Sequence, residues 1–144
     1  HLCGEDNRFN GRLVSVDLAP RCLRDLTFLA QKRPGLVPVL GDARRHEAWG
    51  VLLPRKVNWL FQDVAQAGQV DIFTAACRRF LAPGGMGLLS LKAASERWTG
   101  EGEAALFEEV EQRLNDAGFN VDESIELAGY EDHHRLFVIH SPEA

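Results

Sequence analysis

Two charged side chains, Asp63 and Lys92, stand where β-strands are expected to end. Asp63 closely follows the apolar run 57–61, and Lys92 directly follows the run 87–91. A helix-like segment, Val70–Leu81, lies between the two runs, and this order predicts a βαβ unit with parallel strands. Ligands of open parallel sheets bind beyond the carboxyl ends of the strands. If the strands are neighbours, about 4.8 Å apart, Asp63 and Lys92 can act on one substrate hydroxyl.

The same two residues have a structural alternative. Opposite charges at neighbouring strand ends can form a salt bridge that only caps the sheet, and spacing alone gives this interpretation equal weight.

Length and composition indicate one globular domain. The chain has 144 residues, 45% of them hydrophobic and 26% charged. No apolar run approaches the ~18 residues of a membrane span, and the N-terminus lacks a signal-peptide layout. Cys3, Cys22 and Cys77 are widely spaced, so we expect reduced thiols and no metal site. Cys22 and Cys77 lie in helix-like segments and are expected to be buried.

The net charge of −5 argues against a protein that binds nucleic acid on its own. Phosphate binding needs clustered Lys and Arg, whereas the basic residues here are scattered along the chain. Solvated helix faces explain most of them. Partners would have to supply much of any affinity for nucleic acid.

Strand and helix patterns alternate along the chain. Strands are expected at 12–17, 36–40, 57–61, 85–91, 120–127 and 136–140, and helices from Pro20 to before Pro34, at 70–81 and at 103–117. Pro38 suggests an edge strand, and the segment from Asp42 to Pro54 is expected to be mostly irregular. The alternation predicts an α/β fold with a mostly parallel sheet. The short connection before the last strand makes that strand antiparallel, as in the class I methyltransferase sheet.

Four motifs in this chain resemble those of the fibrillarin family. They are Asp42-Ala43-Arg44, Asp63-Val64-Ala65-Gln66, Lys92-Ala93 and Tyr130-Glu131-Asp132-His133-His134. The chain departs from the family pattern at three places, which together involve four residues. Gly41 replaces an acid, Ala67-Gly68 replaces a turn that usually contains Pro, and His133 replaces an Asp. The resemblance implies a Rossmann-like class I fold and an RNA ribose 2′-O-methyltransferase that uses S-adenosylmethionine.

The resemblance also implies catalytic roles. Asp63 would accept the hydrogen of the substrate 2′-hydroxyl, and Lys92 would stabilise the developing alkoxide or tune Asp63. His134 would be the last member of a Lys-Asp-Lys-His set, or else a rim histidine with no role. The first Lys of this set has no counterpart here, since neither Lys32 nor Lys56 matches its position.

A second group of residues is expected to bind the cofactor. These are Asp17, Leu18, Asp42, Ala43, Asp63, Val64 and Gln66. Asp17 suits the two ribose hydroxyls, with an N-cap for the following helix as its alternative. Asp42 resembles the adenine-contacting turn of the family, and would otherwise belong to an ordinary turn. Asp63, Val64 and Gln66 are expected on the methionine side.

The expected partners follow from the resemblance alone. They are a C/D-type guide RNA, a target rRNA or tRNA, a Nop-domain scaffold protein and a kink-turn-binding protein, without a membrane. The expected location is the cytoplasm of an archaeal-like cell, or the nucleolus of a eukaryote.

The family places another strand and a Gly-rich turn before the strand that ends at Asp17. Residues 1–144 are therefore expected to be the C-terminal part of a methyltransferase catalytic domain, without the N-terminal subdomain and the Gly-rich first motif. His1-Leu2 would be the tail of that motif. Two other functions remain open. One is a cofactor-less paralogue that acts as a ribonucleoprotein assembly subunit, and the other is an NAD-linked oxidoreductase, supported only by Asp17 and the fold.

Overall fold

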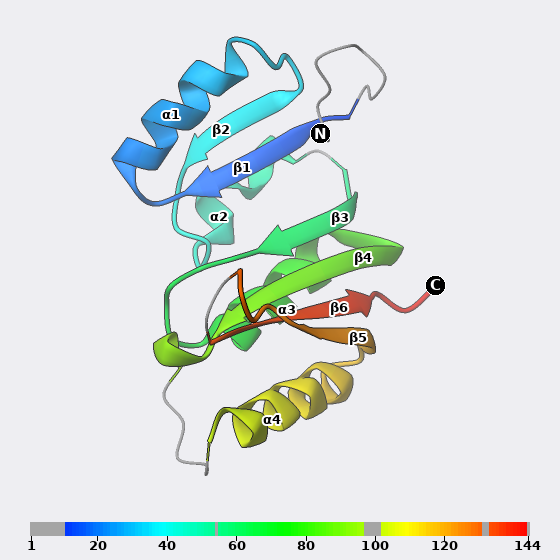
Figure 1. Cartoon of the computed structure of the whole chain (residues 1–144). Helices are drawn as coiled ribbons and strands as arrows, with labels where there is room; N and C mark the ends of the chain where they lie inside the picture. Colours follow the sequence, from blue (N-terminus) through cyan, green and yellow to red (C-terminus); the bar gives the residue numbers. More distant parts are fainter. Residues whose placement is uncertain (1–10, 54, 97–101, 131–132, 144) are drawn as a thin grey trace. The chain divides into compact units, whose positions relative to one another are not determined.

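The computed structural model describes residues 11–53, 55–96, 102–130 and 133–143. The chain divides into two compact units, His1–Pro54 and Arg55–Ala144. Figure 1 shows the elements of both units coloured along the chain.

The first unit contains a parallel strand pair and a covering helix. Its elements are β1 (Leu13–Asp17), α1 (Pro20–Ala30), β2 (Leu36–Leu40), α2 (His46–Trp49) and the 3-10 helix η1 (Gly50–Leu52). In the register, Asp17 at the end of β1 lies beside Leu40 at the end of β2. The segment after β2 is more regular than expected, because Trp49 Nε1 donates to the carbonyl of Asp42 (2.9 Å) and folds the chain back.

The second unit is a mixed sheet with two helices. Its elements are β3 (Val57–Gln62), α3 (Gln69–Phe80), β4 (Leu81–Lys92), the 3-10 helix η2 (Ala93–Ser95), α4 (Glu103–Asp116), β5 (Asn120–Glu126) and β6 (His134–His140). The strand order is β3-β4-β6-β5, with β3 parallel to β4 and β6 antiparallel to both of its neighbours. The predicted βαβ unit and the antiparallel last strand are therefore confirmed.

The core of the second unit lies between one face of this sheet and both long helices. Each helix carries apolar residues at helical spacing, and their buried faces meet the central strands β4 and β6 (Figure 1). Phe73 of α3 and Phe137 of β6 are fully buried. Gly87 of β4 permits this close packing, because an added Cβ would lie 2.8 Å from Ile139 Cδ1 and 2.9 Å from Phe73 Cζ.

Two strands begin earlier than the sequence predicted. Helix α3 ends at Phe80, and Leu81 already pairs with Val57 of β3. Long-range pairing therefore extends β4 backward across the Pro83-Gly84 turn, which by itself signals a break. Strand β6 begins at His134 instead of residue 136, because His134 pairs with Lys92.

The prediction for the cysteines was half right. Cys77 of α3 is 1% exposed, and burial raises the pKa of its thiol to about 12. Cys22 is exposed, so its predicted burial was wrong. Its position lies on the solvent side of α1, which buries no residue completely. Cys3 lies outside the described residues.

Candidate functional site

Three chemically capable side chains meet at one end of the four-stranded sheet. Lys92 is the last residue of β4, and Asp63 follows Gln62, the last residue of β3. His134 is the first residue of the antiparallel β6 and pairs with Lys92 in the register. This end collects the carboxyl ends of the parallel strands, where α/β folds bind their ligands.

The Lys92 side chain projects from the face of the sheet opposite to α3 and α4. Leu89 and Leu91 are fully buried in the core under these helices. Because successive side chains of a strand alternate between faces, Lys92 projects from the other face. His134 is 9% exposed, and as a directly opposed residue it shares the face of Lys92.

Asp63 reaches the same end from β3. Gln62 pairs with Leu89, is buried, and donates from Nε2 to the carbonyl of Gln69 (2.8 Å) on the helical side of the sheet. Asp63 is the next residue and is exposed. Alternation from Gln62 directs Asp63 to the face that Lys92 uses.

The salt bridge proposed as an alternative is not formed in the described part of the chain. Within residues 55–96, 102–130 and 133–143, neither the Asp63 carboxylate nor the Lys92 ammonium forms an ion pair or side-chain hydrogen bond. Both charges are therefore open to a substrate. This geometry favours the chemical interpretation of the pair.

In the first unit, Asp17 has one occupied oxygen. Its Oδ1 accepts a hydrogen bond from the Ala19 amide (2.8 Å), which shapes the turn into α1. The N-cap of α1 is Ala19 itself, so Asp17 is not the cap that the structural alternative required. Within the described residues Oδ2 has no partner, and the adjacent Leu18 is 56% exposed. The arrangement leaves one carboxylate oxygen for a ligand.

Asp42 is held by its neighbour Arg44. Its Oδ1 accepts from the Arg44 amide (2.9 Å), and its Oδ2 accepts from Arg44 Nη2 (2.8 Å). These bonds to Arg44 lower the pKa of Asp42 to about 2. Ala43, between them, is half-buried. An added Cβ at Gly41 would lie 2.8 Å from Trp49 Cδ1, so the indole fills the space where the family's acid would begin.

Replacing Arg44 with alanine is expected to raise the pKa of Asp42 from about 2 toward its ordinary 3.8. The rise should be incomplete, because the residue-44 amide still donates. Since the folded pKa lies below the unfolded one, the carboxylate stabilises the fold above the unfolded value, and this contribution is lost as pH falls through about 2. NMR titration of the Asp42 carboxyl measures both values. Arg45→Ala, the control, should produce a smaller rise, and an equal one would contradict the assignment.

Gln66 carries a feature typical of a binding site. Its Oε1 is buried and has no hydrogen-bond partner within the described residues. An unsatisfied buried acceptor is costly, and a donor from a ligand would satisfy it. Val64, two residues earlier, is half-buried and Ala65 is exposed.

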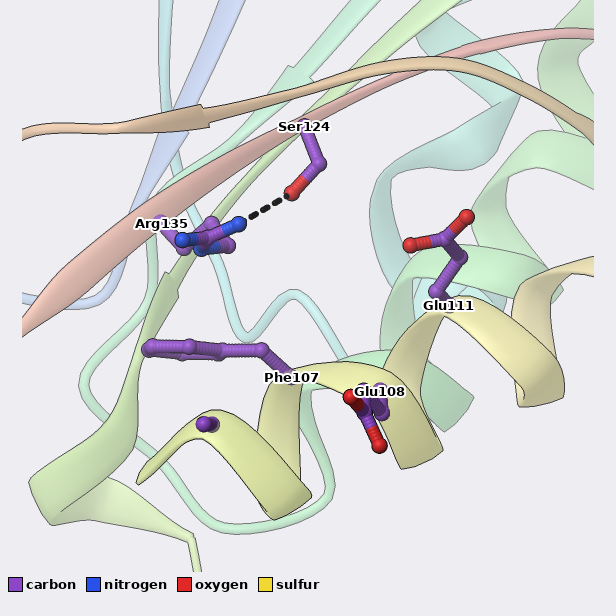
Figure 2. A pocket seen from close by; sticks show the side chains of 6 residues that line it. Phe107, Glu108, Glu111, Ser124 and Arg135 are labelled. Carbon is purple, nitrogen blue, oxygen red and sulfur yellow. Dashed lines mark hydrogen bonds between the residues drawn. The ribbon is translucent and has the colours of Figure 1, made fainter. Parts of the chain in front are cut away.

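A surface pocket of about 240 Å³ lies elsewhere, between α4 and the β5–β6 strands (Figure 2). Arg135 lines it, and its guanidinium stacks 5.1 Å from the Phe107 ring centroid and donates to Ser124 Oγ (3.0 Å). Glu108 and Glu111 line its helical side. None of the predicted site residues lines this pocket, so it is not the candidate site.

Metal and membrane features are not found in the described chain. No group of three or more His, Cys, Asp or Glu side chains there could hold a metal ion. Among the same residues, no helix is both long and apolar enough to cross a membrane.

Sequence reasoning missed Gln69 and Glu96. Gln69 is 0% exposed and bonds the main chain of Lys92, while Glu96 bonds Gln69. The only local signal was a Gln beside the apolar Val70 at the start of a helix.

Tyr130 of the last motif is 92% exposed, whereas Glu131 and Asp132 lie outside the described residues.

The sequence matches one protein family over almost its whole length. The fibrillarin family model matches residues 7–142. The chain is 40% identical over 134 residues to a fibrillarin-like rRNA/tRNA 2′-O-methyltransferase of Thermococcus gammatolerans. This match covers 93% of the chain and 58% of the relative, so the chain spans little more than half of that protein's length.

Solved structures agree with the sequence match. Aeropyrum pernix fibrillarin, in complex with natively bound S-adenosyl-L-methionine, superposes with a TM-score of 0.77 at 32% identity, covering 90% of this chain and 55% of that one. A fibrillarin/Nop5p complex gives a TM-score of 0.83 at 25% identity, covering 91% of this chain and 61% of that one. The expected class I methyltransferase fold is thereby confirmed.

Proposed function

The chain belongs to the fibrillarin family, and we propose that it serves in the S-adenosylmethionine-dependent methylation of ribose 2′-hydroxyls in rRNA or tRNA. The observation that carries this proposal is the convergence of Asp63, Lys92 and His134 on one face of the sheet, at the carboxyl ends of β3 and β4. The name of the Thermococcus relative supports the same reaction.

Each of the two units, taken by itself, carries residues whose chemistry fits part of the cofactor. Asp17 has an open carboxylate oxygen for a ribose hydroxyl, and Gln66 Oε1 is a buried acceptor without a donor in the described chain. Ala43 and Val64 are half-buried and supply apolar surface. Asp42 is less suited to an exocyclic amine than expected, because Arg44 occupies both of its oxygens. Bound S-adenosylmethionine supplies an activated methyl group, so the protein has to position the hydroxyl and accept its proton.

Each member of the convergent set has a separate role. Asp63 Oδ accepts the proton of the 2′-hydroxyl, because it is an exposed carboxylate directly after the end of β3. The Lys92 ammonium stabilises the oxyanion that develops as the proton leaves. His134, beside Lys92 and mostly shielded from solvent, orients the substrate or the Lys92 side chain.

We further propose that partners bring the RNA to this site. The net charge of −5 gives the chain little attraction for phosphates. A fibrillarin/Nop5p complex supports a scaffold protein of the Nop type as one partner. A C/D-type guide RNA, which would select the target nucleotide, and a kink-turn-binding protein complete the proposed particle.

The Asp17→Asn variant tests the cofactor assignment in the full-length protein. The amide oxygen can still accept from Ala19, so the turn into α1 should survive, while the second acceptor oxygen is lost. We expect S-adenosylmethionine affinity to fall roughly 10- to 100-fold by calorimetry, the scale of about 1–3 kcal/mol for a lost charged hydrogen bond. Asp17→Ala should weaken binding at least as much.

Asp25→Asn is the matched control, since Asp25 lies exposed on α1 with its side chain 68% accessible. Unchanged affinity in Asp17→Asn, or a preference for NAD, would contradict the assignment. A wild-type protein that binds no S-adenosylmethionine but still joins the scaffold would favour the cofactor-less assembly subunit.

A further inference from the structure

The main chain of Lys92 is held by a buried side chain from a different element. Gln69, the first residue of α3, is 0% exposed. Its Oε1 accepts from the Lys92 amide (3.0 Å), and its Nε2 donates to the Lys92 carbonyl (3.0 Å). One side-chain amide thus satisfies both backbone groups of Lys92, as a neighbouring strand would.

This contact continues the sheet beyond the end of β3. Ala93 donates to the carbonyl of His133 (3.0 Å), so the backbone of residue 93 faces β6 and that of Lys92 faces the β3 side. Strand β3 ends at Gln62 and offers Lys92 no ladder partner. The Gln69 amide occupies this place. Without it, two partly buried backbone groups at the strand end would lose their bonds.

Further hydrogen bonds fix the Gln69 amide itself. Glu96 Oε1 accepts from Gln69 Nε2 (2.9 Å) and from the Gln69 backbone amide (2.8 Å), and Glu96 Oε2 accepts from the Gly68 amide (3.3 Å). A carboxylate at the N-terminus of α3 is also favoured by the helix dipole. Gln62 Nε2 donates to the carbonyl of Gln69. These bonds tie the end of β3, the start of α3 and the end of β4 together.

We infer that Gln69 is a positioning residue, which sets the position of Lys92 at the end of β4 relative to Asp63. This inference rests on the proposed function, because it acts through the proposed role of Lys92. Asp63 directly follows Gln62, so the same hydrogen-bonded chain determines where both charged groups stand. A misplacement of about 1 Å at a reacting centre can lower the rate about 100-fold.

Gln69→Leu in the full-length protein is the central test. Leucine keeps similar bulk but makes neither bond to Lys92. We expect kcat for methyl transfer to fall about 10- to 100-fold, with KM for S-adenosylmethionine within about twofold of wild type. In a Lys92→Ala background the same substitution should add little further loss, because Gln69 acts through Lys92. A merely structural role would lower activity equally in both backgrounds.

Hydrogen exchange provides a readout that does not depend on catalysis. The Lys92 amide should exchange at least about 10-fold faster in Gln69→Leu, while the core amides of Leu89 and Leu91 keep their protection. Gln112→Leu is the matched control, since Gln112 is exposed on α4 and, among the residues that the structure describes, bonds only Asp116 (2.8 Å). It should change neither exchange at Lys92 nor turnover.

The possible outcomes distinguish the proposed catalytic role of Lys92 from the inferred positioning role of Gln69. The inference is overturned if the Lys92 amide keeps its protection from exchange in Gln69→Leu. It is also overturned if Gln69→Leu keeps full turnover while Lys92→Ala is inactive. If Lys92→Ala itself keeps full turnover, the proposed role of Lys92 fails and amide protection alone decides whether Gln69 positions it. Should Gln69→Leu not fold, Glu96→Gln replaces it. Removing the negative charge of Glu96 should weaken the hydrogen bonds that hold the Gln69 amide and lower kcat about 3- to 10-fold. Unchanged kcat together with unchanged protection of the Lys92 amide in Glu96→Gln overturns the inference.

Discussion

Lys92→Ala is expected to lower methyl transfer about 100- to 1,000-fold while leaving S-adenosylmethionine affinity close to wild type. The Lys92 ammonium has no ion-pair partner within the described residues, and Lys92 is the last residue of β4, at the carboxyl end of that strand. Its stabilisation is needed only when the hydroxyl oxygen becomes negative. Removing an interaction of the transition state lowers kcat without a matching change in ground-state binding.

Asp63→Ala should lower methyl transfer by a similar factor. In the double variant the fold loss of methyl transfer should be much smaller than the product of the two single-variant losses. Both groups act on one proton, and residues that act as a unit are not additive. The assay follows labelled methyl transfer to a guide-paired RNA by the full-length protein assembled with its scaffold proteins. Lys32→Ala, an exposed Lys outside the site, is the control. Near-wild-type turnover of Lys92→Ala would mean that the mechanism is wrong.

Phe137→Ala should cost about 3–5 kcal/mol of unfolding free energy. Phe137 is 0% exposed in the central strand β6, and its ring lies 6.3 Å from that of Phe107. A cavity at this place is surrounded by α4 and β4 and has little freedom to collapse. Urea unfolding followed by circular dichroism measures the loss.

Phe28→Ala provides the comparison for this stability test. Phe28 is 60% exposed on α1, where alanine is a good helix former, so the cost should stay below about 1 kcal/mol. Equal losses in the two variants would show that the core assignment of Phe137 is wrong.

Local patterns in the sequence were sufficient for most of the fold. The helical spacing of Leu106, Val110 and Leu114 predicted α4 to within a residue of its end, and the same three residues are buried. The order of strand and helix patterns predicted that β3 and β4 are parallel, and the structure shows that they are neighbours, which places Asp63 and Lys92 at one end. Sheet alternation then determines the face of each side chain. These are short-range properties, and a sequence displays them directly.

The errors have a common origin in contacts between distant segments. Leu81 joins β4 because Val57 is available to pair with it, although the Pro83-Gly84 turn suggests a break. Cys22 and Cys77 occupy similar helical settings, but only Cys77 meets a sheet. The low pKa of Asp42 has a local cause instead, because Arg44, two residues away, donates to both of its carboxylate oxygens.

The sequence by itself therefore determined the family and the α/β order, and it predicted which residues take part in the chemistry. The tertiary structure alone decided how those residues are held. Gln69 lies 23 positions from Lys92, and nothing in either neighbourhood indicates that one amide bonds both backbone groups of the other residue. Side-chain hydrogen bonds depend on orientation to within a fraction of an ångström, and that orientation exists only after the strands and helices have packed.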